Sequence, residues 1–248
     1  MKIGFSTLSQ FMKSTEEMVS IASRDGFDMI ELLSEGPSRP EILLENPTSL
    51  KSFKETDLEI KIHAPTIDVN LASINPGIRQ ESIRQTQKAL DLADAIGATS
   101  ITTHPGIVHR REKYLREMAM ELLIDSIKQC VEHTETLNTK ISVENMPERF
   151  SFLCNQAEEL ERVVNECGCE ATIDLGHANT TPYPEEFLDI PHIGYYHLND
   201  NNGEKDQHLP LGEGTLNLEL LKKVDKGIIE LNNYDNVLKT QELLKKYI

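Results

Sequence analysis

The chain has 248 residues, with 41 Asp or Glu against 25 Lys or Arg, so its formal net charge is -16. This acidity argues against binding of polyanions by bulk electrostatics, although it leaves room for a local basic groove or for neutralisation by metal ions. No apolar run approaches the roughly 18 residues of a membrane span, and the chain opens on MKIGFSTLS with no signal peptide. We therefore expect a cytoplasmic protein with no membrane partner.

The four cysteines show neither a zinc-ribbon spacing nor the density of a secreted disulfide scaffold. They are expected to be reduced thiols, and the two that flank a glycine are expected to mark the end of a helix. The four are Cys130, Cys154, Cys167 and Cys169.

Short β-rich runs alternate with longer helical patterns along the whole chain. Ser14 and Glu17 form a capping box, which predicts a helix start, and Gly97 predicts a helix stop. The predicted strands are 2–7, 27–33, 59–65, 99–106, 140–147, 170–179, 193–200 and 227–233. The predicted helices are 14–26, 47–57, 78–96, 111–137, 155–167, 184–190, 217–224 and 234–248.

Eight strand–helix units in this length predict the α/β class, with a single (β/α)8 TIM barrel forming one domain over residues 1–248. The alternative is a doubly wound open sheet. That fold needs fewer strands and usually a glycine-rich phosphate loop after its first strand. The segment STLSQF, which follows the first predicted strand here, has no such loop, so the barrel is favoured.

Residues with metal-binding side chains stand at the ends of successive predicted strands, where TIM barrels carry their chemistry. A lone His or Asp at such a place is usually a surface residue or a helix cap, but nine on one rim indicate a metal site. Close carboxylates would be costly without a cation, and the mixed donor set admits zinc, manganese, cobalt or magnesium. The nine are His63, His104, Glu144, Asp174, His177, His197, Asp206, His208 and Glu230. The other three histidines, His109, His133 and His192, are expected on the surface.

At these residues the sequence resembles the xylose isomerase-like TIM-barrel superfamily, which joins endonuclease IV to many sugar isomerases and epimerases. The matching segments occur in family order over nearly the whole chain. They are HAP (63–65), HPG (104–106), VENMP (143–147), DLGHAN (174–179), HLND (197–200), DQHLPLGEG (206–214) and IIELNN (228–233).

The resemblance to endonuclease IV implies three zinc ions held by the nine residues. One ion would be bound by His63, His104 and Glu144. Glu144 would bridge to a second ion, and a third would complete the cluster. The second ion's remaining ligands would be Asp174, His197 and Glu230, and the third ion's would be His177, Asp206 and His208.

The resemblance to the isomerases and epimerases implies one divalent ion bound by Glu144, Asp174, His197 and Glu230. Glu144 and Glu230 would also act as acid and base on opposite faces of the carbon next to a carbonyl. His177 and His208 would then contact sugar hydroxyls. Glu31, at the end of the second predicted strand, is expected to hydrogen-bond the substrate or to cap a loop.

The segments that differ from endonuclease IV are those that read DNA in that family. Thr66 follows HAP, Leu175 and Gly176 precede His177, and two asparagines follow HLND. In the loop LSEGPSRP, Arg39 is the one side chain expected to contact a DNA minor groove. Arg110 and Arg111 are expected either to bind phosphate or to begin the solvated face of the following helix.

We therefore expect a metal-dependent isomerase or epimerase of a small sugar or sugar phosphate, holding one to three divalent ions and compatible with a homodimer. The alternative is an abasic-site endonuclease acting on DNA. A dehydratase or hydrolase on the same barrel, or a non-catalytic metal-binding or scaffolding protein, also remains open.

Overall fold

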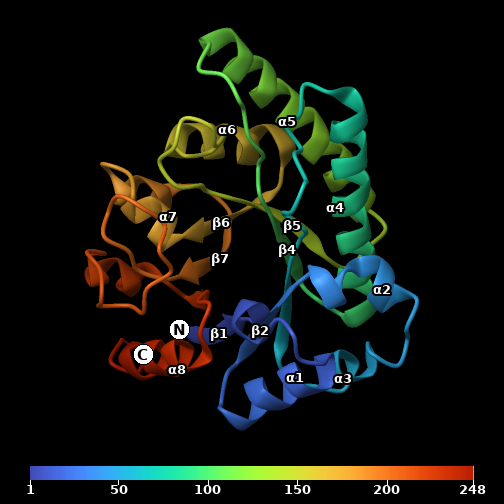
Figure 1. Ribbon diagram of the computed structural model, residues 1–248, viewed down its shortest axis with the longest axis vertical. Coiled ribbons are helices and arrows are strands. Elements are labelled where there is room, and N and C mark those ends of the chain that lie inside the picture. Colours follow the sequence, from blue (N-terminus) through green and yellow to red (C-terminus); the bar gives the residue numbers. More distant parts are fainter. Residues whose placement is uncertain (248) are drawn as a thin grey trace.

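The computed structural model describes residues 1–247, which fold around eight parallel strands (Figure 1). The strands pair in chain order, and β1 also pairs with β8, so the barrel is closed. The predicted single (β/α)8 barrel is therefore confirmed. The strands are β1 Lys2–Ser6, β2 Met29–Leu33, β3 Glu59–His63, β4 Ser100–Thr103, β5 Lys140–Glu144, β6 Glu170–Asp174, β7 Ile193–Leu198 and β8 Lys226–Ile229.

Helices surround the barrel, and the two longest, α4 and α5, pack against each other beside β4 and β5 (Figure 1). The α-helices are α1 Thr15–Arg24, α2 Pro40–Leu44, α3 Lys51–Lys54, α4 Pro76–Ile96, α5 Lys113–Thr134, α6 Ala157–Cys167, α7 Leu175–Asn179 and α8 Tyr234–Leu244. Short 3-10 helices are η1 Thr7–Gln10, η2 Gly36–Ser38, η3 Pro184–Asp189 and η4 Leu218–Lys223. Within residues 1–247, no helix is both long enough and apolar enough to cross a membrane.

Local sequence signals set several helix ends as predicted. Ser14 and Glu17 form the capping box that begins α1. Gly97 and Gly168 follow α4 and α6 with φ of 75° and 67°, in the left-handed region that glycine adopts without a steric penalty. All four cysteines are free and buried.

Several expected elements differ from the structure. The helix predicted at 47–57 is reduced to α3, Lys51–Lys54, and the one predicted at 184–190 is the 3-10 helix η3. The strand predicted over 170–179 ends at Asp174, because this side chain accepts a hydrogen bond from the backbone N–H of His177 and so begins α7. The helix predicted at 217–224 is the 3-10 helix η4, and a long loop joins it to β7. The last helix ends at Leu244, while the final residue of the predicted helix, 248, lies outside the described residues.

The interior of the barrel is polar on one side. Contacts between strands that are not neighbours must cross this interior, and Tyr195 of β7 contacts Thr102 of β4 there. Apolar residues Met29, Tyr195 and Ile228 form a small cluster separate from the main core. TIM barrels usually fill this space with branched apolar side chains. Here buried hydroxyl and charged groups take much of it, namely Glu31, Lys61, Ser100, Thr102, Ser142 and Thr172.

Candidate metal centre

The nine residues proposed as ligands meet where the strands end, at one rim of the barrel. Their potential ligand atoms form overlapping groups, and within each group these atoms all lie within 4.8 Å of one another. The same rim therefore offers one deep group and two that flank it. The groups are Glu144–Asp174–His197–Glu230, His63–His104–Glu144, His177–Asp206–His208, and a further combination, His63–His197–Glu230.

The deep group is centred on His197, which is fully buried at the end of β7. Its Nδ1 atom lies 2.8 Å from Oε1 of Glu144 and 3.2 Å from Oε2 of Glu230. Asp174 completes the group from the end of β6. Three carboxylates and one imidazole converging in a buried volume form a donor set suited to a divalent cation.

The second group surrounds Oε2 of Glu144. This oxygen is buried and has no hydrogen-bond partner among the described residues, yet Nε2 of His63 lies 3.5 Å away and Nε2 of His104 lies 3.2 Å away. Ligand atoms of a tetrahedral zinc ion are separated by about 3.3 to 3.5 Å, given its usual bond lengths. The spacing of these three atoms therefore fits an ion held between them.

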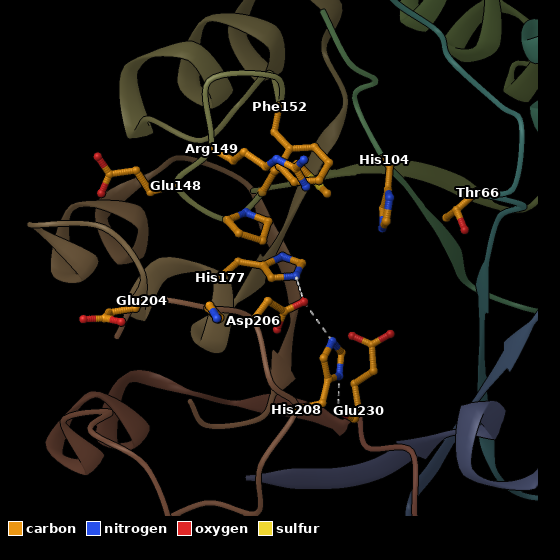
Figure 2. Close-up of a pocket in the computed structure, with 13 residues that line it drawn as sticks. Thr66, His104, Glu148, Arg149, Phe152, His177, Glu204, Asp206, His208 and Glu230 are labelled. Carbon is orange, nitrogen blue, oxygen red and sulfur yellow. Dashed lines mark hydrogen bonds and ion pairs between the residues drawn. The ribbon is translucent and has the colours of Figure 1, made fainter. Parts of the chain in front are cut away.

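The third group lies nearer the surface, on α7 and on the loop after β7. Oδ2 of Asp206 lies 3.3 Å from Nε2 of His177 and 3.1 Å from Nε2 of His208 (Figure 2). Figure 2 shows both imidazoles turned toward the Asp206 carboxylate. The separations are again those of neighbouring ligands around one ion.

Backbone carbonyls fix the orientation of three of these rings. Nδ1 of His63 lies 2.9 Å from the carbonyl of Ala64, and Nδ1 of His177 lies 2.8 Å from that of Asn145. Nδ1 of His208 lies 2.8 Å from the carbonyl of Glu230. A carbonyl only accepts hydrogen bonds, so each Nδ1 carries the proton and each Nε2 is free to bind a metal ion.

Two asparagines that the sequence analysis missed hold Asp174 in place. Asn199 donates to its Oδ2 at 2.8 Å, and Asn145 bonds its backbone through both the N–H and the carbonyl. Asn145 and Asn199 are each fully buried. Their place one residue after Glu144 and two after His197 is the signal that would have indicated this role.

The charges of the rim depend on each other. Burial raises the pKa of Asp174 to about 6, against the attraction of His177. Burial lowers the pKa of His177, but the charge of Asp174 and the hydrogen bond to Asp206 outweigh this effect and raise the pKa to about 10. Burial likewise lowers the pKa of His208, and its hydrogen bond to Asp206 raises it to about 10. The carboxylates are thus balanced by protonated imidazoles, a balance that a bound divalent cation would provide instead.

The same balance operates in the deep group. Burial raises the pKa of Glu144, but the charge of His197 and the nearby imidazole of His104 outweigh this effect and hold the pKa well below its usual range. Burial lowers the pKa of His63, while Glu144 raises it to about 9. The residues present therefore fit a metal ion in chemistry as well as in spacing.

A pocket of about 720 Å³ opens at this rim. Its lining includes five of the proposed ligands, His104, His177, Asp206, His208 and Glu230 (Figure 2). The rest of the lining comes from the segment after β5 and from the loop after β7. Those lining residues are Met146, Pro147, Glu148, Arg149, Phe152, Glu204 and Lys205, with Thr66 at the edge.

Glu31, predicted to hydrogen-bond the substrate or to cap a loop, does not line this pocket. Its side chain is fully buried on β2, with Oε2 2.9 Å from Nε2 of His197. It thus lies behind a proposed ligand, because it points into the barrel from the middle of β2.

Other predicted residues lie at the edge of the site or away from it. Arg39 is exposed beside α2. The guanidinium of Arg111 lies over the ring of Phe150, beside a separate hollow of about 450 Å³ that Arg110 also lines. Both arginines precede α5, as a solvated helix start would. Among the other histidines, His109 and His192 are exposed, and His133 is half-buried and paired with Asp91 on α4.

Comparison with known proteins identifies the family. A family model described as a xylose isomerase-like TIM barrel matches residues 19–242. The chain belongs to this family. An uncharacterized protein of Methanocaldococcus jannaschii is 30% identical over 268 residues, which cover 100% of this chain and 89% of that protein.

Two further relatives of this xylose isomerase-like barrel bear names from different branches. The crystal structure of a D-tagatose 3-epimerase-like protein is 30% identical, with a TM-score of 0.88, and the match covers 100% of this chain and 97% of that one. The "Probable endonuclease 4" of Mesomycoplasma hyopneumoniae is 30% identical over 191 residues, which cover 69% of this chain and 66% of that protein. The predicted family is confirmed, and both of its branches occur among the relatives.

Proposed function

We propose that this protein is a metal-dependent isomerase or epimerase of a small sugar or sugar phosphate. The observation that carries the proposal is the deep group, in which Glu144 and Glu230 both approach His197 and Glu230 lines the 720 Å³ pocket. A pocket of this volume falls within the range of roughly 300 to 1,000 Å³ typical of small-molecule sites. A chain with 30% identity over its whole length to a D-tagatose 3-epimerase-like protein supports the same substrate class.

Glu144, Asp174, His197 and Glu230 would hold the ion, which is zinc, manganese, cobalt or magnesium. When bound, it would polarise a substrate carbonyl and the neighbouring hydroxyl. Glu144 and Glu230 would take a proton from the carbon beside the carbonyl and return one to it. His177 and His208, on the pocket wall, would hydrogen-bond sugar hydroxyls.

The remaining residues that line the pocket are compatible with a bound sugar. Met146, Pro147 and Phe152 provide an apolar surface that displaces water from the bound sugar. Arg149 and Lys205 also line the pocket, next in sequence to Glu148 and Glu204. An anionic group on the substrate would be recognised by the two cations.

A second candidate function is favoured by the two flanking groups. His63 and His104 around Glu144, and His177 and His208 around Asp206, have spacings that fit two more ions. A single-ion isomerase does not need them as ligands. Three ions would suit an abasic-site endonuclease of the endonuclease IV type, with DNA as its partner, and a relative bears that description.

The test begins with the metal content of gently purified protein, measured by elemental mass spectrometry. An isomerase is expected to contain about one divalent ion and to epimerise one of a panel of ketoses, aldoses and their phosphates. Glu144→Gln and Glu230→Gln should lower turnover by about 10² to 10⁴-fold, because each removes a proton-transfer group. His104→Ala should leave the ion bound.

About three zinc ions per chain, with nicking of abasic duplex DNA that His104→Ala abolishes, would favour the endonuclease and overturn the isomerase proposal. His109→Ala is the matched control, since this histidine is exposed and outside the pocket. It should change neither metal content nor activity.

A further inference from the structure

The His197 ring is held from both sides by carboxylates. Its Nδ1 atom faces Glu144 and Glu230 in the deep group, while its Nε2 atom lies 2.9 Å from Oε2 of Glu31. His197 and Glu31 are each fully buried. This ring differs from those of His63, His177 and His208, whose second nitrogen bonds a backbone carbonyl.

Glu31 is itself held by a column of hydroxyl groups that crosses the barrel. The Tyr195 hydroxyl donates to Oε2 of Glu31 at 2.7 Å. Thr102 contacts the Tyr195 hydroxyl, and Thr172 lies 2.5 Å from Thr102. The column continues to Ser142, whose hydroxyl lies 2.7 Å from that of Thr172.

The carboxylate at the end of this column sets the direction of every hydrogen bond in it. A carboxylate can only accept, so Tyr195 must donate to Glu31. The Tyr195 oxygen then accepts from Thr102, which accepts from Thr172, which accepts from Ser142. Hydrogen bonds aligned head to tail in a buried region polarise one another. The column therefore fixes the position of the Glu31 carboxylate.

We propose that Glu31 is a positioning residue that keeps the Nε2–H of His197 bonded and so presents the Nδ1 lone pair to a metal ion. The proposal rests on the proposed function, because it requires a metal ion in the deep group. Carboxylate partners of this kind fix the tautomer of a ligand histidine and raise its basicity, and losing one typically costs 10 to 100-fold in metal affinity. Tyr195 supports Glu31 from below.

The structure explains why Glu31 is available for this role. β2 and β7 are not neighbours in the barrel, so a side chain from the middle of β2 reaches His197 only through the interior. Glu31 has no exposed surface and lines no part of the pocket. It therefore acts through His197 and has no contact of its own with a sugar or with DNA.

The experiment measures Co²⁺ binding, with the metal alone as the probe. Titration calorimetry gives the affinity, and the visible spectrum of bound Co²⁺ reports its ligand set. His197→Ala first identifies which ion depends on the deep group. We expect Glu31→Ala to weaken that same ion by about 10 to 100-fold and to alter its spectrum. Glu31→Gln, which keeps an acceptor but loses the charge, and Tyr195→Phe should give smaller losses in the same direction.

The matched control is Glu59→Gln, another glutamate-to-glutamine change on a barrel strand. Glu59 begins β3 at the opposite end of the barrel, where it pairs with Lys2, Lys61 and Lys226. This variant should change stability but leave Co²⁺ affinity and spectrum as in the parent. Its Co²⁺ affinity falling as far as that of Glu31→Gln would mean that the effect is global, and the positioning role would be refuted.

Two other outcomes separate this inference from the function on which it rests. A parent protein that binds Co²⁺ tightly, with folded Glu31→Gln and Tyr195→Phe variants that bind it equally well and with the same spectrum, would overturn the positioning role alone. A parent that binds no Co²⁺ in the deep group would overturn the metal-dependent function, and the role of Glu31 with it. If Glu31→Ala does not fold, the two near-isosteric variants still decide between these outcomes.

Discussion

Asp200 accepts a hydrogen bond at 3.0 Å from the backbone N–H of Gly214, which lies 14 residues further along the chain. The same carboxylate accepts from the N–H groups of Asn201, Gly212 and Leu216. It is fully buried. The Asp200 side chain, just after β7, therefore joins the two ends of the loop that places Asp206 and His208 at the rim.

We expect Asp200→Asn to destabilise the protein by about 2 to 4 kcal/mol, because each of the two carboxylate oxygens accepts from two N–H groups. In either orientation, the new amide NH2 group faces two donors. The loop that carries Asp206 and His208 would loosen. The affinity of the third group for its ion would therefore fall more than that of the deep group. Denaturant unfolding and metal content per chain measure the two effects.

The control for this change is Asp189→Asn, whose carboxylate is three-quarters exposed and pairs only with Lys223. A surface ion pair of this kind contributes at most about 1 kcal/mol. Equal stability losses in the two variants would show that the Asp200 hydrogen bonds do not hold the loop.

Gly176 has space for hydrogen only. A Cβ atom added there would lie 1.8 Å from Oδ1 of Asn199, the residue that donates to Asp174. We expect Gly176→Ala to displace Asn199, to cost about 1 to 3 kcal/mol of stability, and to weaken metal binding in the deep group by about 10-fold. Thermal unfolding and Co²⁺ titration measure these effects.

Gly77→Ala tests whether helix propensity explains the result. Gly77 lies in the first turn of α4, and a Cβ atom there would come no closer than 3.5 Å to any neighbour. Alanine favours a helix over glycine by up to about 1 kcal/mol, so this variant should be neutral or more stable. A Gly176→Ala protein that behaves in the same way would contradict the role given to Asn199.

The metal-free protein should lose stability as the pH rises from about 6.5 toward 10. His177 and His208 have pKa values of about 10 in the folded protein, against an ordinary value of about 6.5. A raised folded pKa contributes stability that is complete below the unfolded pKa and is lost as the pH passes the folded pKa. Where an ion occupies the third group, both rings are neutral ligands and make no such contribution.

The measurement is Tm at several pH values with a chelator and with bound metal. Buried thiols, such as Cys130 with a pKa raised by burial to about 12, also lower stability at high pH, but they do so in both forms. Only the difference in Tm between the metal-free and metal-loaded forms therefore reports the protonation of His177 and His208. A Tm difference that stays constant from pH 6.5 to 9.5 would argue against protonated imidazoles in the metal-free rim.

Metal binding should release protons and should tighten as the pH rises from 7 to 9. In the three-ion arrangement, His63, with a pKa of about 9, and His177, with one of about 10, must each lose a proton before binding an ion. Calorimetric titrations in buffers of different ionisation enthalpy count the protons released. Binding that is independent of pH, with no proton release, would mean that these two rings are not ligands.

The sequence was sufficient to predict the barrel and the convergence of the nine rim residues, because six of them stand at or next to the end of a strand. The other three, His177, Asp206 and His208, follow in α7 and in the loop after β7. The end of β6 was misjudged, since the pattern of 170–179 does not reveal that Asp174 caps a new helix. The contacts of Glu31 could not be predicted for a different reason. Its neighbours across the barrel, Tyr195 and His197, are far away in sequence, and only the closed topology brings them together.

The proposed ligands at the rim are supported in two different ways. Glu144, Asp174 and His197 are carried by strands, whereas Asp206 and His208 depend on a loop closed by Asp200. If the rim holds metal ions as proposed, their number can therefore be changed by exchanging one surface segment, without rebuilding the scaffold that would bind the innermost ion. A family that shares this division could evolve single-ion and multi-ion enzymes from one another through loop replacement.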